Sequence, residues 1–176
     1  KNVSQHELRE RIGYVPQKGV LFSGTIDSNL RYGRENATEK EIEKAAQIAQ
    51  ATEFIETKPE KYNTEIAQGG SNVSGGQKQR LAIARALIQK TEIILFDEAT
   101  SALDNETQEK ITKAINNMKK EYTIMVIAHR LSTIINADKI FFLNNGKIEC
   151  SGTHEYLLKH SKEYKKLYET EIKKGK

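Results

Sequence analysis

The sequence predicts an α/β fold built on a parallel β-sheet, with a helical subdomain inserted into it. Four apolar residues at 93–96 run directly into two acids, which indicates a strand buried on both faces in the middle of a parallel sheet. A second buried apolar strand is expected at 123–128, after an intervening helix, and a right-handed crossover should place both strands in one sheet. Residues 38–90 read as mostly helical, apart from a loop at 58–72, and lie between two strand regions. We therefore expect them to form the inserted subdomain.

The composition is typical of a globular protein. The 176 residues suffice for one domain with a core, and the 37% hydrophobic and 30% charged residues exclude a disordered chain. No apolar run approaches the about 20 residues that span a bilayer, and the start lacks the form of a signal peptide. The single Cys150 cannot form an internal disulfide, which suggests a reducing, cytosolic environment. The net charge of +4 is spread along the chain and is not clustered with aromatic residues, so we expect no nucleic-acid binding.

Helix starts are marked by capping boxes, in which a Ser or Thr side chain and the residue three positions later cap each other's backbone N–H groups. Three such pairs are present: Ser4 with Glu7, Thr38 with Glu41, and Ser74 with Gln77. Asp104 or Asn105 is expected to cap a further helix, and a helical pattern runs from Thr153 into a charged tail. The turn Asn144-Asn145-Gly146 between two apolar runs predicts a β-hairpin.

Several candidate site residues follow the ends of predicted strands. Asp97 and Glu98 end the central strand, where open parallel sheets bind their ligands. A metal ion or a catalytic role would compensate for burying two adjacent carboxylates, although a strand that ends in a polar turn fits the pair equally well. His129 follows the second strand and should lie at the same edge. A single histidine after a strand is more often structural, but its position at the same edge as an acid pair favours a role in the site. Gln17 lies at the exit of a short strand at 12–15, which a proline ends.

The glycine-rich segment at 74–77 predicts a helix N-terminus that is open to an anion. Free N–H groups and the positive end of the helix dipole favour negative charge there. Lys78, Arg80 and Arg85 on the same helix would be available to phosphate or carboxylate. Taken alone, a glycine-rich cap without a ligand is the simpler interpretation of this segment.

In their order along the chain, these motifs resemble the ATPase domain of ABC transporters, specifically of the exporter type. The matching segments are Tyr14-Val15-Pro16-Gln17 for the Q-loop, 21–26 for the exporter segment beside the membrane-domain contact, Val73-Ser74-Gly75-Gly76-Gln77 for the signature motif, 93–97 for the Walker B strand, Glu98 for the catalytic glutamate, Ser101-Ala102-Leu103-Asp104 for the D-loop, and His129 for the switch histidine. The resemblance covers nearly the whole chain and implies a P-loop NTPase-like core.

The resemblance also implies a site for ATP and Mg²⁺. Asp97 would hold Mg²⁺ through water, and Gln17 would sense the metal and the attacking water. Glu98 would orient or deprotonate that water, and His129 would contact the γ-phosphate, so that Gln17, Glu98 and His129 form the catalytic set. The nucleotide contacts implied are Ser74, Gly75, Gly76, Gln77 and Asp104, and the first three of them would cap ATP bound to the opposite subunit.

Two features depart from the family pattern. No G-x-x-x-x-G-K-[ST] motif is present, so the phosphate-cradling P-loop is missing, and we expect a fragment without the N-terminal portion of the domain that is inactive alone. Residues 67–70 differ from the glutamate-containing form common in exporters, and Val73 replaces the usual leucine. Glu98 is intact, which argues against a non-hydrolysing domain.

The segments expected from the resemblance are 1–34 for the Q-loop region, 38–90 for the helical subdomain with the signature motif, 91–152 for the catalytic strands, and 153–176 for the C-terminal helix. The expected function is ATP hydrolysis that drives transmembrane export at the cytoplasmic face of the cell membrane. The expected partners are a second ABC ATPase domain and a transmembrane domain upstream on the same chain. Two alternatives remain: a non-catalytic module that supplies the signature face in trans, and a soluble ABC-type ATPase of DNA maintenance.

Overall fold

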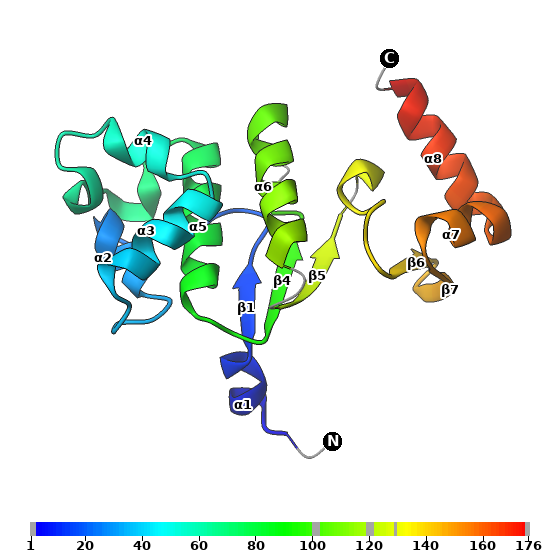
Figure 1. Ribbon diagram of the computed structural model, residues 1–176, viewed down its shortest axis with the longest axis horizontal. Helices are drawn as coiled ribbons and strands as arrows, with labels where there is room; N and C mark the ends of the chain where they lie inside the picture. Colours follow the sequence, from blue (N-terminus) through cyan, green and yellow to red (C-terminus); the bar gives the residue numbers. More distant parts are fainter. Residues whose placement is uncertain (1–2, 100–102, 119–121, 129, 175–176) are drawn as a thin grey trace. The chain divides into compact units, whose positions relative to one another are not determined.

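The computed structural model describes residues 3–99, 103–118, 122–128 and 130–174 (Figure 1). The chain divides into two compact units, residues 1–127 and residues 128–176, and each is described by itself. Within the described ranges, no helix has the length and apolar character needed to cross a membrane.

The first unit is organised on a three-stranded parallel sheet, which confirms the predicted α/β class. Its strands in spatial order are β1 (Ile12–Val15), β4 (Ile93–Asp97) and β5 (Thr123–Ile127). Val15 pairs with Phe96, and Asp97 pairs with Ile127, so the carboxyl ends of the three strands lie at one edge (Figure 1). The helix α6 (Asn105–Met118) connects β4 to its parallel neighbour β5 and completes the predicted strand–helix–strand unit.

The prediction that both apolar strands are buried on two faces is wrong for one face of each. On β4, Ile94 and Phe96 are buried in the core, whereas Ile93, Leu95 and Asp97 on the other face are only half-buried. On β5, Ile124 packs against the core, but Met125 and Ile127 on the other face are 57% and 47% exposed. In the described part of the chain, β5 pairs only with β4 and is an edge strand. An apolar run indicates that a segment forms a strand, but it does not show what covers the second face of that strand.

The helices of the first unit begin where the capping boxes predicted them. The predicted starts belong to α1 (Gln5–Glu10), α3 (Glu39–Ile48) and α5 (Gly75–Ile88), and both halves of each capping box are formed. The remaining helices are α2 (Ile26–Arg31) and α4 (Thr52–Glu56). α5 contacts β1 as well as α2 and α3, and it lies between them in Figure 1. Its inward residues Leu81 and Ala84 are fully buried, as their spacing predicts.

The segment at 58–72, which reads as loop, contains short ordered elements. These are η1 (Lys61–Asn63), β3 (Glu65–Ile66) and η2 (Gln68–Gly70). β3 pairs antiparallel with β2 (Gly24–Thr25), which ties this segment to the chain shortly after β1. Strands of two residues carry no periodic pattern, so the sequence could not reveal this pairing.

Arg85 of α5 fixes the segment between β1 and α2. Its guanidinium donates to the carbonyl oxygens of Asn29 and Val20 and to Oδ1 of Asn29, each at 2.9 Å. The buried Asn29 side chain also bonds the backbone N–H and C=O of Phe22. The rings of Phe22 and Tyr32 lie over the guanidinium, with centroids 5.2 and 5.7 Å from its Cζ. Burial lowers the pKa of Arg85 from its ordinary value, and a guanidinium remains charged at neutral pH.

We expect Arg85→Lys to lower the free energy of unfolding by about 2 kcal/mol, because an ammonium cannot reproduce the planar fork of donors and leaves the acceptors of Asn29 underbonded. Urea denaturation of the chain measures this change. The matched substitution Arg9→Lys, on the exposed helix α1, should change stability by less than about 0.5 kcal/mol. Equal stability of the two variants would show that the Arg85 network does not hold this segment.

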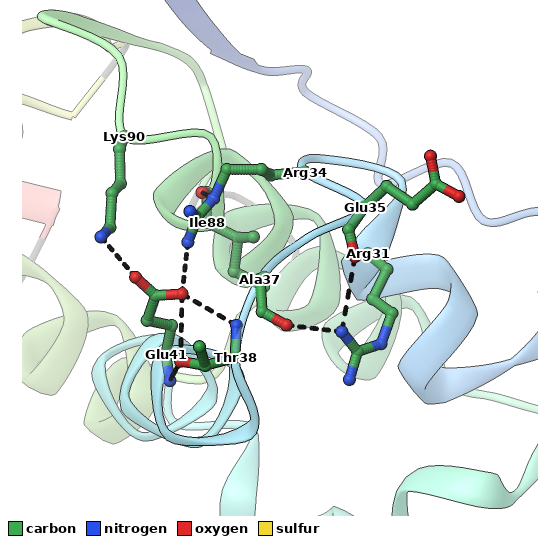
Figure 2. Close-up of polar contacts among 8 residues, drawn as sticks. All are labelled: Arg31, Arg34, Glu35, Ala37, Thr38, Glu41, Ile88 and Lys90. Atoms are coloured by element: carbon green, nitrogen blue, oxygen red, sulfur yellow. Dashed lines mark hydrogen bonds and ion pairs between the residues drawn. The ribbon is translucent and has the colours of Figure 1, made fainter.

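Glu41, in the first turn of α3, links that helix to the end of α5 (Figure 2). Its carboxylate forms ion pairs with Lys90 and Arg34 and accepts from the N–H of Thr38 at 2.8 Å. Arg34 also donates to the carbonyl oxygen of Ile88 at 3.2 Å. The hydrogen bond from Lys90, followed by that from the Thr38 backbone, lowers the pKa of Glu41 to about 2.

This low pKa predicts an acid-sensitive contribution to stability. The ionised Glu41 stabilises the fold fully above its ordinary pKa of 4.5, and this contribution is lost as the pH falls toward about 2. Glu41→Gln should therefore lower the melting temperature at pH 7, and the difference from the unsubstituted chain should disappear near pH 2. Thermal denaturation across this range measures both effects, with the exposed Glu43→Gln on the same helix as control. A difference that is independent of pH would contradict the proposed ion pairs.

The second unit is a β-hairpin followed by two helices. Its elements are η3 (Leu131–Thr133), β6 (Ile140–Asn144), β7 (Lys147–Gly152), α7 (His154–His160) and α8 (Lys162–Lys174). Asn145 and Gly146 form the turn with φ angles of 48° and 73°, the conformation that an Asn-Gly pair favours. Thr153 caps α7, which begins where the helical pattern was predicted to start. The small core of this unit consists of Leu131, Ile140, Leu157 and Tyr164.

Candidate functional site

The edge of the sheet where β1 and β4 end carries three of the predicted site residues. Gln17 Nε2 donates a hydrogen bond to Glu98 Oε2 at 2.9 Å. Tyr14 Oη donates a hydrogen bond to Asp97 Oδ2, also at 2.9 Å. Both bonds run from β1 or its exit to the acids that follow the apolar part of β4. The structure therefore brings Gln17 and Glu98 into direct contact and gives each acid a separate donor.

Glu98 has a backbone conformation that is unusual for a residue with a side chain. Its φ angle is 48°, in the left-handed region. Its N–H donates to the carbonyl oxygen of Ile127 at 2.9 Å, and the next residue, Ala99, is buried. Strain of this kind costs of the order of 1–3 kcal/mol, and it persists where the surroundings fix the conformation. The bond to β5 and the burial of Ala99 are such constraints, and they direct the Glu98 side chain toward Gln17.

The two acids are half-buried, which corrects the expectation that burial alone calls for a metal or a catalytic role. Asp97 and Glu98 both keep partial contact with solvent. Their desolvation is therefore moderate, and their burial is equally compatible with a strand that ends in a polar turn. What distinguishes the pair from an ordinary turn is its geometry, namely the two specific donors and the strained Glu98 backbone.

The first turn of α5 is open to an outside group at Gly75. The capping box engages the N–H of Gln77 and the N–H of Ser74, and helix geometry leaves those of Gly75 and Gly76 to an outside acceptor. A Cβ placed on Gly75 would meet no atom within 4 Å. Nothing in the described packing therefore requires glycine at this position. Glycine would be required there if a group from outside the chain approached the backbone closely.

The loop that follows Gln17 packs directly on α5. Gln79 Nε2 donates to the carbonyl oxygen of Pro16 at 2.8 Å, and its side chain is only 1% exposed. A Cβ on Gly19 would lie 2.6 Å from the carbonyl oxygen of Lys78, so only glycine allows the loop to approach this closely. The segment that carries Gln17 and the helix that begins at Ser74 are thus held together within the first unit.

The cations of α5 are engaged within the chain, contrary to the expectation that they are available to phosphate or carboxylate. Lys78 Nζ donates to the carbonyl oxygen of Gly69 at 2.9 Å, and Arg80 Nη1 donates to that of Gln50 at 3.1 Å. Arg85 forms the network described above. The sequence shows that these three cations belong to one helix. It does not show their carbonyl partners, because those lie in segments that only the tertiary fold brings near.

Asp104, rather than Asn105, caps α6. Its Oδ1 accepts from the N–H of Thr107 at 2.9 Å, and this bond lowers the pKa of Asp104 from its ordinary value. The other D-loop residues predicted from the sequence, Ser101 and Ala102, lie outside the described residues, as does His129. Leu103 is buried in the core of the first unit.

The donor chemistry at the sheet edge fits Mg²⁺. Asp97 offers a carboxylate, and Gln17 offers an amide oxygen, because its amide nitrogen faces Glu98. Mg²⁺ prefers oxygen ligands, keeps several waters and takes further ligands from bound phosphates. Over the ranges that the structure covers, no cluster of three or more His, Cys, Asp or Glu side chains could hold a metal unaided. Asp97 and Gln17 are thus the oxygen ligands that this edge could offer to such an ion.

Tyr14 and Gln79 are the residues near the site that the sequence interpretation missed. Strand alternation places Tyr14 on the opposite face from the buried Val15, and this signal could have shown that its side chain was free to reach Asp97. Gln79 lies four residues before Ile83 on the buried face of α5, where a polar residue indicates a specific partner. The partners themselves are distant in sequence.

Comparison with known proteins finds similarity to ABC transporters. The family model described as ABC transporter matches residues 1–101. The ATP-dependent lipid A-core flippase of Desulfotalea psychrophila is 46% identical over 168 residues, which are 96% of this chain and 29% of that protein. ABC transporter B family member 4 of Dictyostelium discoideum is 48% identical over 172 residues, which are 98% of this chain and 22% of that protein.

A solved structure gives the same result for the fold. The structure of a bacterial Atm1-family ABC exporter with ATP bound superposes on this chain with a TM-score of 0.90 at 42% identity. The matched region is 96% of this chain and 29% of the exporter chain. The chain thus spans less than a third of the length of the relatives it matches. Because the family model matches 101 of its 176 residues, the chain belongs to the ABC transporter family.

Proposed function

We propose that this chain forms the signature and catalytic part of an exporter-type ATPase domain, which hydrolyses ATP to drive transmembrane export. The observation that carries the proposal is the Gln17–Glu98 hydrogen bond beside Asp97, at the carboxyl edge of a parallel sheet. The exporter relatives and the ATP-bound exporter structure support ATP as the nucleotide. The P-loop that the sequence lacks would come from a preceding segment, as the length of the relatives suggests.

Hydrolysis would rest on how the chain holds its two acids. Glu98, turned toward Gln17, would accept a proton from the attacking water. Gln17 would orient Glu98 through its amide nitrogen and keep its amide oxygen for the water or the metal. Asp97 would hold Mg²⁺ through water, and that ion would supply charge neutralisation at the phosphates. His129 would contact the γ-phosphate, by resemblance to the family.

The signature segment would act on a second nucleotide. Gly75 and Gly76 offer N–H groups at a helix N-terminus, and the open space at Gly75 leaves room for a phosphate oxygen. The ATP that they contact would be bound by the opposite ATPase domain, with Ser74, Gln77 and Asp104 close to it. Hydrolysis would therefore require a dimer of ATPase domains. The close packing of the Gln17 loop on α5 would couple the chain's own site to the partner's.

The membrane domain would dock on the aromatic surface beside the Q-loop. Phe22 is 44% exposed and Tyr32 is 70% exposed, although both are ordered by Arg85. An exposed apolar pair that is held this firmly suits a binding surface. The chain would lie at the cytoplasmic face of the cell membrane. The segments 1–34, 38–90, 91–152 and 153–176 remain our proposed division into the Q-loop region, helical subdomain, catalytic strands and C-terminal helix.

The test compares this chain with the complete domain, by which we mean this chain preceded by a P-loop segment from a related exporter. Calorimetry with MgATP should show no binding to the chain alone at millimolar concentration and clear binding to the complete domain, which should also hydrolyse ATP. Binding without hydrolysis would favour the non-catalytic module that supplies the signature face in trans. Stimulation of hydrolysis by DNA would favour the ATPase of DNA maintenance. ATP binding by the chain alone would contradict the proposed role of the P-loop.

A further inference from the structure

Tyr14 occupies a position from which its hydroxyl can act on Asp97 without taking part in the core. In the parallel register of β1 and β4, Tyr14 pairs with Leu95, and Asp97 is two residues farther along β4 on the same face. The phenol therefore reaches the next residue along this face rather than its direct partner. Tyr14 is 51% exposed, whereas the following Val15 is fully buried. The fold thus uses Val15 for packing and leaves the Tyr14 hydroxyl for another role.

The chemistry of this contact suits a carboxylate that binds a cation. The phenol donates to Oδ2 of Asp97 at 2.9 Å. A neutral donor fixes the carboxylate without cancelling its negative charge. Only one oxygen is engaged by Tyr14, which leaves the other to face a cation or a cation-bound water.

We infer that Tyr14 is a positioning residue for the carboxylate of Asp97, which it holds in the orientation that binds the metal of a metal–nucleotide complex. This inference rests on the proposed function, and it adds a residue to which the family resemblance gave no role. Glu98 receives its own hydrogen bond from Gln17, so the two acids are held by different donors. Loss of the Tyr14 hydroxyl should therefore affect metal affinity and leave the proton-accepting step intact.

The test is Tyr14→Phe in the complete domain, which keeps the ring and removes only the hydroxyl. Binding of Mn²⁺ in the presence of a non-hydrolysable ATP analogue, followed by electron paramagnetic resonance, should weaken by about 3- to 10-fold. This is less than the about 10- to 100-fold typical of residues that orient a metal ligand, because water partly replaces the exposed hydroxyl. Affinity for the analogue in EDTA should not change. The half-saturating Mg²⁺ concentration for hydrolysis should rise by the same factor, and saturating Mg²⁺ should restore kcat.

Two controls separate this role from a structural one. Tyr156→Phe, the same substitution at an exposed tyrosine of α7, should leave Mn²⁺ affinity unchanged. In an Asp97→Asn background, Tyr14→Phe should add no further loss of Mn²⁺ affinity, because its effect passes through Asp97. Unchanged or tighter Mn²⁺ binding in Tyr14→Phe alone would overturn the inference. Absence of any Mn²⁺–nucleotide binding in the unsubstituted complete domain would instead overturn the proposed function, and this inference with it.

Discussion

Replacing Glu98 with glutamine should lower kcat for MgATP hydrolysis by the complete domain by about 10²- to 10⁴-fold, the usual contribution of a positioned general base. Glutamine has nearly the same shape and can still bond Gln17, but it cannot accept a proton from water. The strained backbone at φ 48° is retained, because the substitution changes only the end of the side chain. ATP binding should stay within about 2-fold of the unsubstituted domain, since general-base catalysis acts on the transition state and not on the bound nucleotide.

The control for this prediction is Glu92→Gln, which removes a carboxylate just before the start of β4. Glu92 is exposed and lies 3.5 Å from Arg11, far along the strand from the acid pair. Its loss should leave kcat unchanged, because an exposed ion pair of this length contributes little. Steady-state kinetics and calorimetry on both variants give kcat and the affinity for ATP. Full activity in Glu98→Gln would remove Glu98 from the mechanism.

Gly75→Asp should abolish cooperation between two ATPase domains without harming the fold. Aspartate in the first turn of a helix stabilises that helix, and the added side chain enters open space. The same carboxylate would face the γ-phosphate of the opposite domain, where two like charges about 4 Å apart repel by about 4 kcal/mol at an effective dielectric of 20. Turnover at a fixed domain concentration should therefore fall by about 10²- to 10³-fold, while the melting temperature stays equal or rises.

Gly19→Ala provides the contrasting case. Its Cβ would clash with the backbone of Lys78 at 2.6 Å, so this variant should lower the melting temperature through the fold itself. Thermal denaturation together with turnover distinguishes the two glycines. Undiminished turnover in Gly75→Asp would show that no phosphate approaches this helix. A lower melting temperature in Gly75→Asp would mean that the chain's own packing requires the glycine.

The local parts of this fold could be predicted from the sequence because their signals are contained in a few consecutive residues. Ser4, Thr38 and Ser74 each begin a helix with a complete capping box, and the Asn-Gly turn closes a hairpin. The parallel pairing of β4 with β5 followed from one rule on the connection between parallel strands.

What the sequence could not supply depends on which distant segments meet. The apolar run of β5 gave no sign that Met125 would face solvent, because an edge strand and a central strand can share one pattern. Arg85 looked available to a ligand because its partner Asn29 lies 56 residues away. The candidate site shows the same contrast between local and distant signals. Sequence motifs pointed to Gln17 and Glu98, whereas the donor to Asp97 was found only in the structure.

The decisive measurement for the proposed dimer is the mass of the complete domain carrying Glu98→Gln, determined by light scattering with and without ATP. The substitution should stop turnover and so preserve the state with ATP bound. We expect a monomer without nucleotide and a dimer with ATP, because in the proposed function each signature segment would complete the other domain's site. A domain that binds ATP and stays monomeric would contradict the central claim that Ser74, Gly75 and Gly76 act on a nucleotide held by a second ATPase domain.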